Sequence, residues 1–334
     1  YRTRQGVLNV SFEQNIPDQL LQAFRAARKV LLAAHIGLDG DHLGSMLALR
    51  KALEMMGKEV VAYLPETVPP NYHFLLELDR LSPELPAHDF DTLITLECPN
   101  VARLPAGIDV KSTAPTVINL DHHPDNEMYG QHIWVEPQAA ALGEMICDLI
   151  EKLEVPLDRA MAMGLYVAIL TDTGSFQYSR VRPATHRRLA RLLEFNLPTD
   201  LIARSIYRQS RPEVLKLLGH VLTDVTVTDN GQVAWAEIPF ERMQSYGVRP
   251  EDTQFFIDDV DRVAGPEVVT LFRELGDGRV KVSLRSKDAP INAVAAKFGG
   301  GGHAKAAGCV VRGELSEVRT RVVDAVTESL RVNA

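Results

Sequence analysis

The stretch HIGLDGDHLGS at residues 35–45 constrains the fold most, because it joins the apolar run 29–34 to an amphipathic segment at 46–56. Apolar run, Gly/Asp loop and helical periodicity in this order predict a strand, a tight loop and a helix. Open α/β sheets bind ligands at the carboxyl ends of their strands, where this loop places His35, Asp39 and Asp41. One imidazole and two carboxylates suit a divalent cation. An Asp/Gly turn with a helix cap is the alternative interpretation.

Two further strand-like runs, at 91–96 and 116–120, also end in side chains that bind metals. The first closes on Glu97 and the second on the run Asp121-His122-His123, and a later apolar helix ends beside Asp172. The carboxyl ends of parallel strands meet in one crevice. Ligands in that number would hold two cations about 3.5–4 Å apart, a geometry that clamps a phosphoryl group during hydrolysis. The mixture of imidazole and carboxylate favours Mn²⁺ over Ca²⁺.

The domain organisation follows from length and from a change of pattern. The 334 residues are about twice the length of a typical domain. Strand, loop and helix alternate in the first part, whereas strand-like runs and Gly-rich turns dominate from about residue 224. We therefore predict an α/β fold with a parallel-sheet domain over 1–210, a linker helix over 211–223 and a smaller α+β domain with a mixed sheet over 224–334. A short helix is also expected at 72–78.

The charge and the cysteines narrow the class of protein. A net charge of −8 argues against a broad basic face for nucleic acids. Eight arginines and only two acids lie between Arg180 and Arg211. Such a local positive strip fits a small anionic substrate, although a solvated helix face would have the same composition. Three scattered cysteines, no signal peptide and no 18-residue apolar run predict a reduced protein of the cytoplasm without a membrane span.

A second functional centre is predicted at Gly299–Gly302 and His303. Residues without a Cβ let backbone N–H groups approach an anion closely, although a flexible loop would have the same composition. No Gly-Lys-Ser/Thr follows, so the run is not a Walker A loop. Polar side chains at the end of a nearby strand could bind phosphate, with ordinary surface polarity as the alternative: Ser283, Arg285, Ser286 and Lys287.

In combination these motifs resemble the DHH phosphoesterase family, which is named for the run seen here as Asp121-His122-His123. HIGLDGDHLGS resembles the first motif of the family, DHHPDN the third and TDTGSF the fourth. The stretch VSLRSKDAPINAVAAKFGGGGHAKAAG resembles the associated C-terminal domain in the subgroup with a GGGH loop. The resemblance extends from about residue 28 to 312, and the chain is most similar to the stand-alone, NrnA-type subgroup.

The resemblance implies a site for two Mn²⁺ ions, with Mg²⁺ or Co²⁺ as alternatives. His35 and Asp39 would hold one ion, and the other would be held by Asp41, His122 and Asp172. A carboxylate at the end of the third strand would bridge both ions. His123 would face the substrate phosphate as a proton donor or electrostatic partner. Asp121, placed with His123 among the catalytic residues, would act by orienting His122.

Further motif positions imply contacts with the substrate. Arg103 and Asn126 would line the pocket. The far end of the nucleotide would be held in the C-terminal domain by Ser283, Arg285, Gly301, Gly302 and His303.

The bridging position is normally Asp in this family, and here it is Glu97. The extra methylene would still let the carboxylate reach both ions, but only after it shifts or tilts. The spacing and occupancy of the metals, and with them the rate, are expected to depend on this residue. Asp91 would not substitute for it, because it lies six residues earlier at the opposite end of the strand.

The activity implied by the resemblance is Mn²⁺-dependent hydrolysis of short oligonucleotides to mononucleotides and dephosphorylation of 3′-phosphoadenosine 5′-phosphate (pAp). Expected partners are single-stranded RNA or DNA of two to five nucleotides, dinucleotides and pAp, and a homodimer is left open. Two alternatives remain. The same site could cleave linear or cyclic dinucleotides, or the change at Glu97 could have left a catalytically weakened nucleotide sensor.

Overall fold

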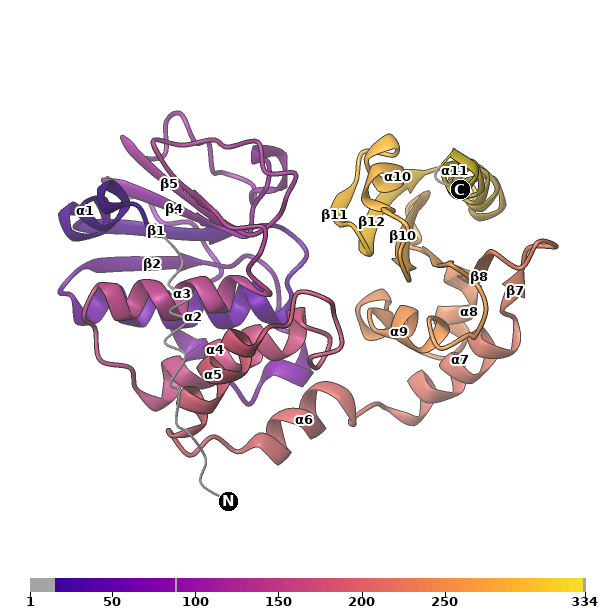
Figure 1. The fold of residues 1–334 in the computed structure, drawn as a ribbon, viewed down its shortest axis with the longest axis horizontal. Helices are drawn as coiled ribbons and strands as arrows, with labels where there is room; N and C mark the ends of the chain where they lie inside the picture. The colour runs from indigo at the N-terminus through magenta and orange to yellow at the C-terminus, as the bar shows by residue number, and fades with distance from the viewer. Residues whose placement is uncertain (1–15, 88, 333–334) are drawn as a thin grey trace, which may run out of the picture. The chain divides into compact units, whose positions relative to one another are not determined.

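The computed structural model describes residues 16–87 and 89–332. These residues form two compact units, one extending to Arg208 and the other beginning at Gln209. Each unit has its own sheet, and Figure 1 shows the first in indigo to magenta and the second in orange to yellow. The predicted α/β fold, with a parallel sheet followed by a smaller mixed sheet, is confirmed. No helix within the described ranges is both long and apolar enough to span a membrane.

The first unit contains a six-stranded sheet in the order β3-β2-β1-β4-β5-β6, and all its strand pairs are parallel. The strands are β1 (Lys29–Ala34), β2 (Glu59–Tyr63), β3 (Leu81–Ser82), β4 (Thr92–Leu96), β5 (Thr116–Asp121) and β6 (His132–Val135). The central strands β1, β4 and β5 are mostly apolar and are buried beyond their first residues, because both faces of the sheet are covered. The edge strands β3 and β6 are too short to show a pattern in the sequence.

Helices cover one face of this sheet, and Figure 1 shows α2 and α3 along it with α4 and α5 beyond them. Loop residues around Ile108 and Val110 cover the other face. The helices are α1 (Asp18–Ala26), α2 (Gly40–Met55), α3 (Leu142–Lys152), α4 (Arg159–Asp172), α5 (Pro183–Leu193) and α6 (Thr199–Tyr207), with short 3₁₀ turns at η1 (Pro70–Tyr72), η2 (Leu78–Arg80) and η3 (Val101–Arg103).

The helix expected at 72–78 is wrong, because this segment holds only turns between η1 and η2. Glu77 takes a left-handed backbone with φ of 64°, which a continuing helix does not allow. Its carboxylate pairs with the guanidinium of Arg50 and with Lys51. The Arg50 side chain is only 1% exposed, and a buried guanidinium without a paired carboxylate would be unfavourable. The ion pair with Glu77 therefore favours the turn over a continuous helix.

Helices α2 and α4 cross in close contact at glycines. A Cβ on Gly44 would lie 2.1 Å from the carbonyl oxygen of Gly164, and a Cβ on Gly164 would lie 2.7 Å from that of Gly44. One turn away, a Cβ on Gly40 would meet the side chain of Thr171 at 2.5 Å. The two helices run in opposite directions, and this contact brings the first turn of α2 beside the last turn of α4. Asp41 and Asp172 lie on those two turns.

The second unit contains a mixed sheet in the order β11-β12-β10-β9-β8-β7, in which only β8 and β9 pair in parallel. Its strands are β7 (Thr226–Val227), β8 (Val233–Ile238), β9 (Val268–Glu274), β10 (Arg279–Ser286), β11 (Gly301–His303) and β12 (Ala306–Arg312). Its helices are α7 (Pro212–Thr223), α8 (Phe240–Ser245), α9 (Phe256–Val260), α10 (Asn292–Lys297) and α11 (Leu315–Val332), with a 3₁₀ turn, η4, at Pro250–Thr253.

Apolar clusters pack on both faces of this second sheet. Residues of α10 and α11 form one cluster, and residues of α7, α8 and α9 form the other. The domain boundaries predicted at 210 and 223 stay a prediction. Helix α7, which covers the predicted linker, buries Val214, Leu217 and Val221 in the second unit.

Candidate active site

The register of the first sheet aligns three predicted ligands. Ala34 of β1 pairs with Leu96 of β4, and Leu96 pairs with Leu120 of β5. His35, Glu97 and the end of β5 at Asp121 therefore follow one another along a single edge of the sheet. Because this edge collects the carboxyl ends of parallel strands, it is the expected place for a ligand site.

Glu97 belongs to two groups of ligands that could each hold a metal ion. One group consists of His35, Asp39 and Glu97, and the other of Asp41, Glu97 and His122. Within each group the donor atoms all lie within 4.8 Å of one another. Asp172 joins the second group, since its Oδ2 lies 3.5 Å from Nε2 of His122. The six residues predicted to bind metal are thus brought together, and they fall into the two predicted sets.

Both imidazoles present the same nitrogen to the carboxylates. Nδ1 of His35 lies 2.9 Å from the carbonyl oxygen of Ile36, and Nδ1 of His122 lies 3.3 Å from that of Ala139. A carbonyl only accepts, so Nδ1 carries the proton and Nε2 keeps its lone pair in each neutral ring. These Nε2 atoms face Glu97 at 3.9 Å and 3.1 Å. A second partner that fixes the tautomer in this way is typical of histidines that bind metals.

Glu97 follows β4 with φ of 51°, a left-handed backbone that is uncommon for a residue other than glycine. Its side chain is almost fully buried, and Oε2 accepts no hydrogen bond from any residue that the structure describes. A buried carboxylate oxygen of this kind requires a cation or a proton. Such backbone strain is most often found at functional sites.

Asp41 lies on the first turn of α2 and reaches the first turn of α3. Its two oxygens accept hydrogen bonds from the backbone N–H groups of Leu142 and Gly143 at 2.6 Å and 2.8 Å, and from the hydroxyl of Ser45 at 3.0 Å. The N-terminus of a helix stabilises a carboxylate through these amides and through the helix dipole. The carboxylate is therefore held in position from two helices.

The DHH turn is built around the carboxylate of Asp121. Oδ1 accepts hydrogen bonds from the backbone N–H groups of His122 and His123 and lies 2.7 Å from Nδ1 of His123. Oδ2 accepts a hydrogen bond of 2.6 Å from the amide of Asn126. Both oxygens are thus occupied inside the turn, which fits a role in orienting the two histidines rather than in binding metal.

The carboxylates at the sheet edge have strongly displaced pKa values. Burial, followed by the charges of nearby carboxylates, raises the pKa of Glu97 and of Asp41 well above the usual range. Burial acts in the same direction on Asp39 and Asp121, but contacts with His35 and His123 respectively outweigh it. The pKa of Asp39 is therefore lowered well below its usual range, and that of Asp121 to about 2.

This set of donors fits divalent cations. Clustered, buried carboxylates repel one another, and the Nε2 atoms of His35 and His122 face them, so a cation between these groups would offset the repulsion and could bind both nitrogens. Their nitrogen and oxygen atoms suit Mn²⁺ and related ions. The part of the chain that the structure describes therefore holds groups that could bind a metal at the predicted place.

Arg103 and Asp91 lie at opposite ends of the sheet. Arg103 ends η3, its carbonyl accepts a hydrogen bond from Ile36, and its charge acts on Glu97 and lowers the pKa of that carboxyl. Asp91 precedes β4 and accepts hydrogen bonds from the backbone N–H groups of Arg28 and Lys29. As expected, Asp91 closes the far end of the strand.

His42 is a residue at the site that sequence reasoning missed. Its ring packs edge-on against that of His35 with centroids 5.3 Å apart, and it is 1% exposed. No described residue forms a hydrogen bond with either of its ring nitrogens. Burial, followed by the charges of His35 and Arg103, lowers its pKa to about 3, so that the ring is neutral. Its place beside Asp41 in the sequence was the available signal.

The second predicted centre lies in the second unit. Ser283 and Arg285 belong to β10, and Gly301 to His303 form the edge strand β11, which pairs with β12. A Cβ on Gly302 would lie 2.8 Å from the carbonyl oxygen of Ala306, so this close pairing itself requires glycine. A Cβ on Gly300 would likewise lie 2.1 Å from the carbonyl oxygen of Gly308. The glycine run is therefore partly a strand, and its packing accounts for two glycines without any ligand.

Arg285 donates a hydrogen bond of 3.1 Å to Oδ1 of Asp258 in α9. Sequence analysis did not predict a role for Asp258. It lies in a helix of only five residues, which is too short to show a periodic pattern in the sequence. The guanidinium is thus held by a carboxylate of its own unit.

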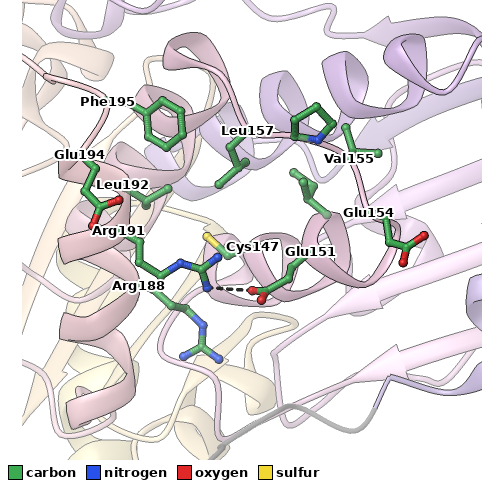
Figure 2. A pocket seen from close by; sticks show the side chains of 12 residues that line it. Cys147, Glu151, Glu154, Val155, Leu157, Arg188, Arg191, Leu192, Glu194 and Phe195 are labelled. Atoms are coloured by element: carbon green, nitrogen blue, oxygen red, sulfur yellow. Dashed lines mark hydrogen bonds and ion pairs between the residues drawn. The ribbon is translucent and has the colours of Figure 1, made fainter.

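A separate hollow of about 400 Å³ lies between α3 and α5 (Figure 2). Apolar side chains such as Leu157 and Phe195 line it, and an ion pair between Arg191 and Glu151 spans one side. None of the predicted metal ligands lines this hollow. The chemistry predicted from the sequence is therefore not located there.

Comparisons with known proteins agree with the fold and identify the family. The model of the DHH family N-terminal domain matches residues 29–169, and that of the DHHA1 domain matches residues 230–331. The chain belongs to the DHH family of phosphoesterases, as the motifs predicted.

The chain is similar to proteins described as "Bifunctional oligoribonuclease and PAP phosphatase NrnA". It is 34% identical to that of Thermus thermophilus over 305 residues, or 90% of each chain. It is 24% identical to that of Bacillus subtilis over 296 residues, which are 88% of this chain and 92% of the relative. In fold it is similar to an exopolyphosphatase-related protein from Bacteroides fragilis, with a TM-score of 0.81, 23% identity and coverage of 94% and 95% of the two chains.

Proposed function

We propose that this protein is a Mn²⁺-dependent phosphoesterase that hydrolyses short oligonucleotides to mononucleotides and removes a phosphate from pAp. The observation that carries the proposal is that two groups of metal-type ligands share Glu97 at the carboxyl edge of a parallel sheet. The printed names of its relatives, oligoribonuclease and PAP phosphatase, supply the substrate class. Three free, buried cysteines support a reducing compartment such as the cytoplasm.

His35 and Asp39 would hold one cation, Asp41, His122 and Asp172 would hold the other, and Glu97 would contact both. Manganese is the proposed ion, with Mg²⁺ or Co²⁺ as alternatives. Two bound divalent cations supply a nucleophile from water at neutral pH and offset the charge of the phosphoryl oxygens. The hydrogen bonds of Asp41 with the first turn of α3 would keep its carboxylate aimed at the cluster.

His123 is the proposed proton donor to the leaving oxygen. Its Nδ1 lies 2.7 Å from Oδ1 of Asp121, which fixes the orientation of the ring. Asn126 ties the same carboxylate from the other side through Oδ2. Asp121 would therefore act through His122 and His123 rather than on the substrate, and Arg103 would bind substrate near Glu97.

In the second unit, we propose that Ser283, Arg285, Gly301, Gly302 and His303 recognise the remainder of the nucleotide. A guanidinium and backbone N–H groups suit a phosphate or a base edge. Recognition of a chain end together with its scissile phosphate would favour two to five nucleotides and pAp over long RNA.

The test is digestion of 5′-labelled RNAs of two to ten nucleotides, with pAp in parallel, in the presence of Mn²⁺. Release of mononucleotide from the shortest RNAs, and its loss in Asp172→Ala, would support the proposal. Full activity of Asp172→Ala would contradict the metal assignment. Tight binding of dinucleotides without turnover would instead identify a nucleotide sensor, and cleavage of cyclic dinucleotides in the same assay would identify the alternative phosphodiesterase.

A further inference from the structure

Arg180 lies on the loop that follows α4, and it is held beside the ligand cluster. Its Nη1 donates a long hydrogen bond of 3.5 Å to the carbonyl of Pro137. Two residues further on, the carbonyl of Ala139 fixes the ring of His122. The loop itself begins at Asp172, whose carboxylate lies 3.5 Å from Nε2 of the same ring. Arg180 is thus linked to the surroundings of His122 in two ways, by its hydrogen bond with Pro137 and by the loop that begins at Asp172.

The conformation of this loop is unusual. Gly174, Ser175 and Phe176 are consecutive residues with φ of 54°, 57° and 70°. A left-handed backbone is unfavourable for Ser and Phe, and the hydroxyl of Thr173 supports it by accepting a hydrogen bond from the N–H of Phe176. The strained turn folds the chain back on the end of α4, where the N–H groups of Gln177 and Tyr178 donate hydrogen bonds to the carbonyl of Thr173. Arg180 is the first cation that the returning chain carries.

The guanidinium of Arg180 has almost all of its donors unused within its own surroundings. It is partly buried, and no described acid lies within ion-pair distance of it. Burial lowers its pKa, while the charges of Asp172, Asp41, Glu97 and Glu144 oppose that change. Three of these four carboxylates are proposed metal ligands, which would be neutralised by their cations when these are bound. The fourth, Glu144, already lies 3.8 Å from the guanidinium of Arg188. A desolvated cation with five N–H donors then lacks a counter-ion.

We propose that Arg180 binds a non-bridging oxygen of the scissile phosphate. A planar guanidinium matches two oxygens of a phosphate. Its positive charge stabilises the negative charge that develops on the phosphoryl oxygens in the transition state. The inference rests on the proposed phosphoesterase function. It adds Arg180, which lies outside the motifs that supply the metal ligands, to the residues that contact the substrate. It also gives a specific role to one arginine of the positive strip between Arg180 and Arg211.

The test compares Arg180→Ala, Arg180→Lys and the control Arg187→Ala. Arg187 is an exposed arginine of α5, so that its variant makes the same change in net charge. We expect Arg180→Ala to lower kcat/KM for a dinucleotide and for pAp about 100-fold, as the loss of one donor to a developing oxyanion does. Arg180→Lys should recover part of the loss, and Arg187→Ala should keep the wild-type value. Binding of Mn²⁺, measured by calorimetry without substrate, should not be weakened in any of the three variants, because loss of a nearby positive charge does not disfavour a cation.

A dinucleotide with sulfur in place of one non-bridging oxygen gives a second readout. The stereoisomer that removes the contacted oxygen should slow the wild type more than Arg180→Ala, which has already lost the contact. Wild-type kinetics in Arg180→Ala, or a loss that is matched by an equal loss of Mn²⁺ affinity, would overturn the inference while leaving the proposed function in place. Absence of turnover in the wild type with Mn²⁺ would overturn the proposed function, and this inference with it.

Discussion

Nε2 of His122 lies 3.1 Å from Oε1 of Glu97, and the other carboxylate oxygen of Glu97 lies 3.9 Å from Nε2 of His35. One glutamate thus reaches both imidazoles from the end of β4. It does so from a backbone with φ of 51°. The position that the family normally fills with Asp is accordingly the point at which the two ligand groups meet.

Removing the charge of Glu97 should affect both ions. We expect Glu97→Gln to weaken Mn²⁺ binding about 10- to 100-fold, because a shared carboxylate is lost while the size of the side chain is kept. Calorimetric titration with Mn²⁺ measures this change directly. Glu59→Gln is the matched control, since Glu59 is exposed at the opposite end of the sheet. Two unaltered Mn²⁺ sites in Glu97→Gln would exclude Glu97 as the shared ligand.

Stability without metal should decrease as the pH rises. Burial and neighbouring carboxylates raise the pKa of Glu97 and Asp41, so the folded protein retains protons that the unfolded chain has released. The free energy of unfolding therefore falls as the pH rises above the ordinary carboxyl pKa of about 4. Asp39 and Asp121, with lowered pKa values, contribute the opposite slope only below that pH. His42, with its pKa lowered to about 3, contributes the opposite slope up to the ordinary histidine pKa of about 6.5, but the two carboxylates with raised pKa values outweigh this one group.

Thermal unfolding between about pH 5 and pH 8 tests this linkage. In EDTA the Tm should fall across the range, and Glu97→Gln should flatten the curve. Excess Mn²⁺ should raise the Tm most at the higher pH values, because cations bind ionised carboxylates. A Tm in EDTA that increases throughout this range would contradict the raised pKa values.

The contact between α2 and α4 should tolerate no side chain. Gly44→Ala would place a Cβ 2.1 Å from a backbone oxygen, and we expect a loss of about 1–3 kcal/mol in the free energy of unfolding. The displaced helices would also separate Asp41 from Asp172 and reduce activity. Denaturant unfolding and dinucleotide turnover measure the two effects.

Gly219→Ala is the control for that substitution. Gly219 lies within α7, and a Cβ at this position would have nothing within 4 Å of it, so alanine should stabilise the protein by about 0.5–1 kcal/mol. Equal stability changes in the two variants would show that helix propensity, rather than close approach of the backbones, governs Gly44.

Asp121 should act through the histidines. We expect Asp121→Asn to lower kcat about 100-fold and to leave most of the Mn²⁺ affinity, because its oxygens are engaged by His123, Asn126 and backbone N–H groups. Asp172→Ala should abolish turnover and weaken Mn²⁺ binding together. Measuring kcat and Mn²⁺ affinity in both variants distinguishes a residue that orients the histidines from one that binds metal. An equal loss of Mn²⁺ affinity in the two variants would place Asp121 among the metal ligands.

Asp258 should influence the substrate through Arg285. Asp258→Asn removes the charge that holds the guanidinium at 3.1 Å, so we expect a change in KM for pAp of several-fold with little change in kcat. Arg285→Ala should raise KM further, by the equivalent of about 1–3 kcal/mol. Unchanged KM values in both variants would remove this pair from substrate binding.

Much of the fold could be predicted from local patterns. The strands predicted at 29–34, 91–96 and 116–120 are found at Lys29–Ala34, Thr92–Leu96 and Thr116–Asp121, because apolar runs limited by turns define a strand locally. Other elements depended on distant partners. The turn at Glu77 follows its ion pair with Arg50, and the short helix α9 is stabilised by packing rather than by its own pattern.

Local patterns in the sequence place metal-binding residues at the ends of strands, because the order of strand, loop and helix is encoded within a few neighbouring residues. How these residues combine depends on the tertiary fold: Glu97 is shared by two ligand groups, Asp121 is hydrogen-bonded within its own turn, and His42 is buried against His35. Distances, tautomers and pKa values arise from groups far apart in the chain, which the register of the sheet and the glycine contact of α2 with α4 bring together.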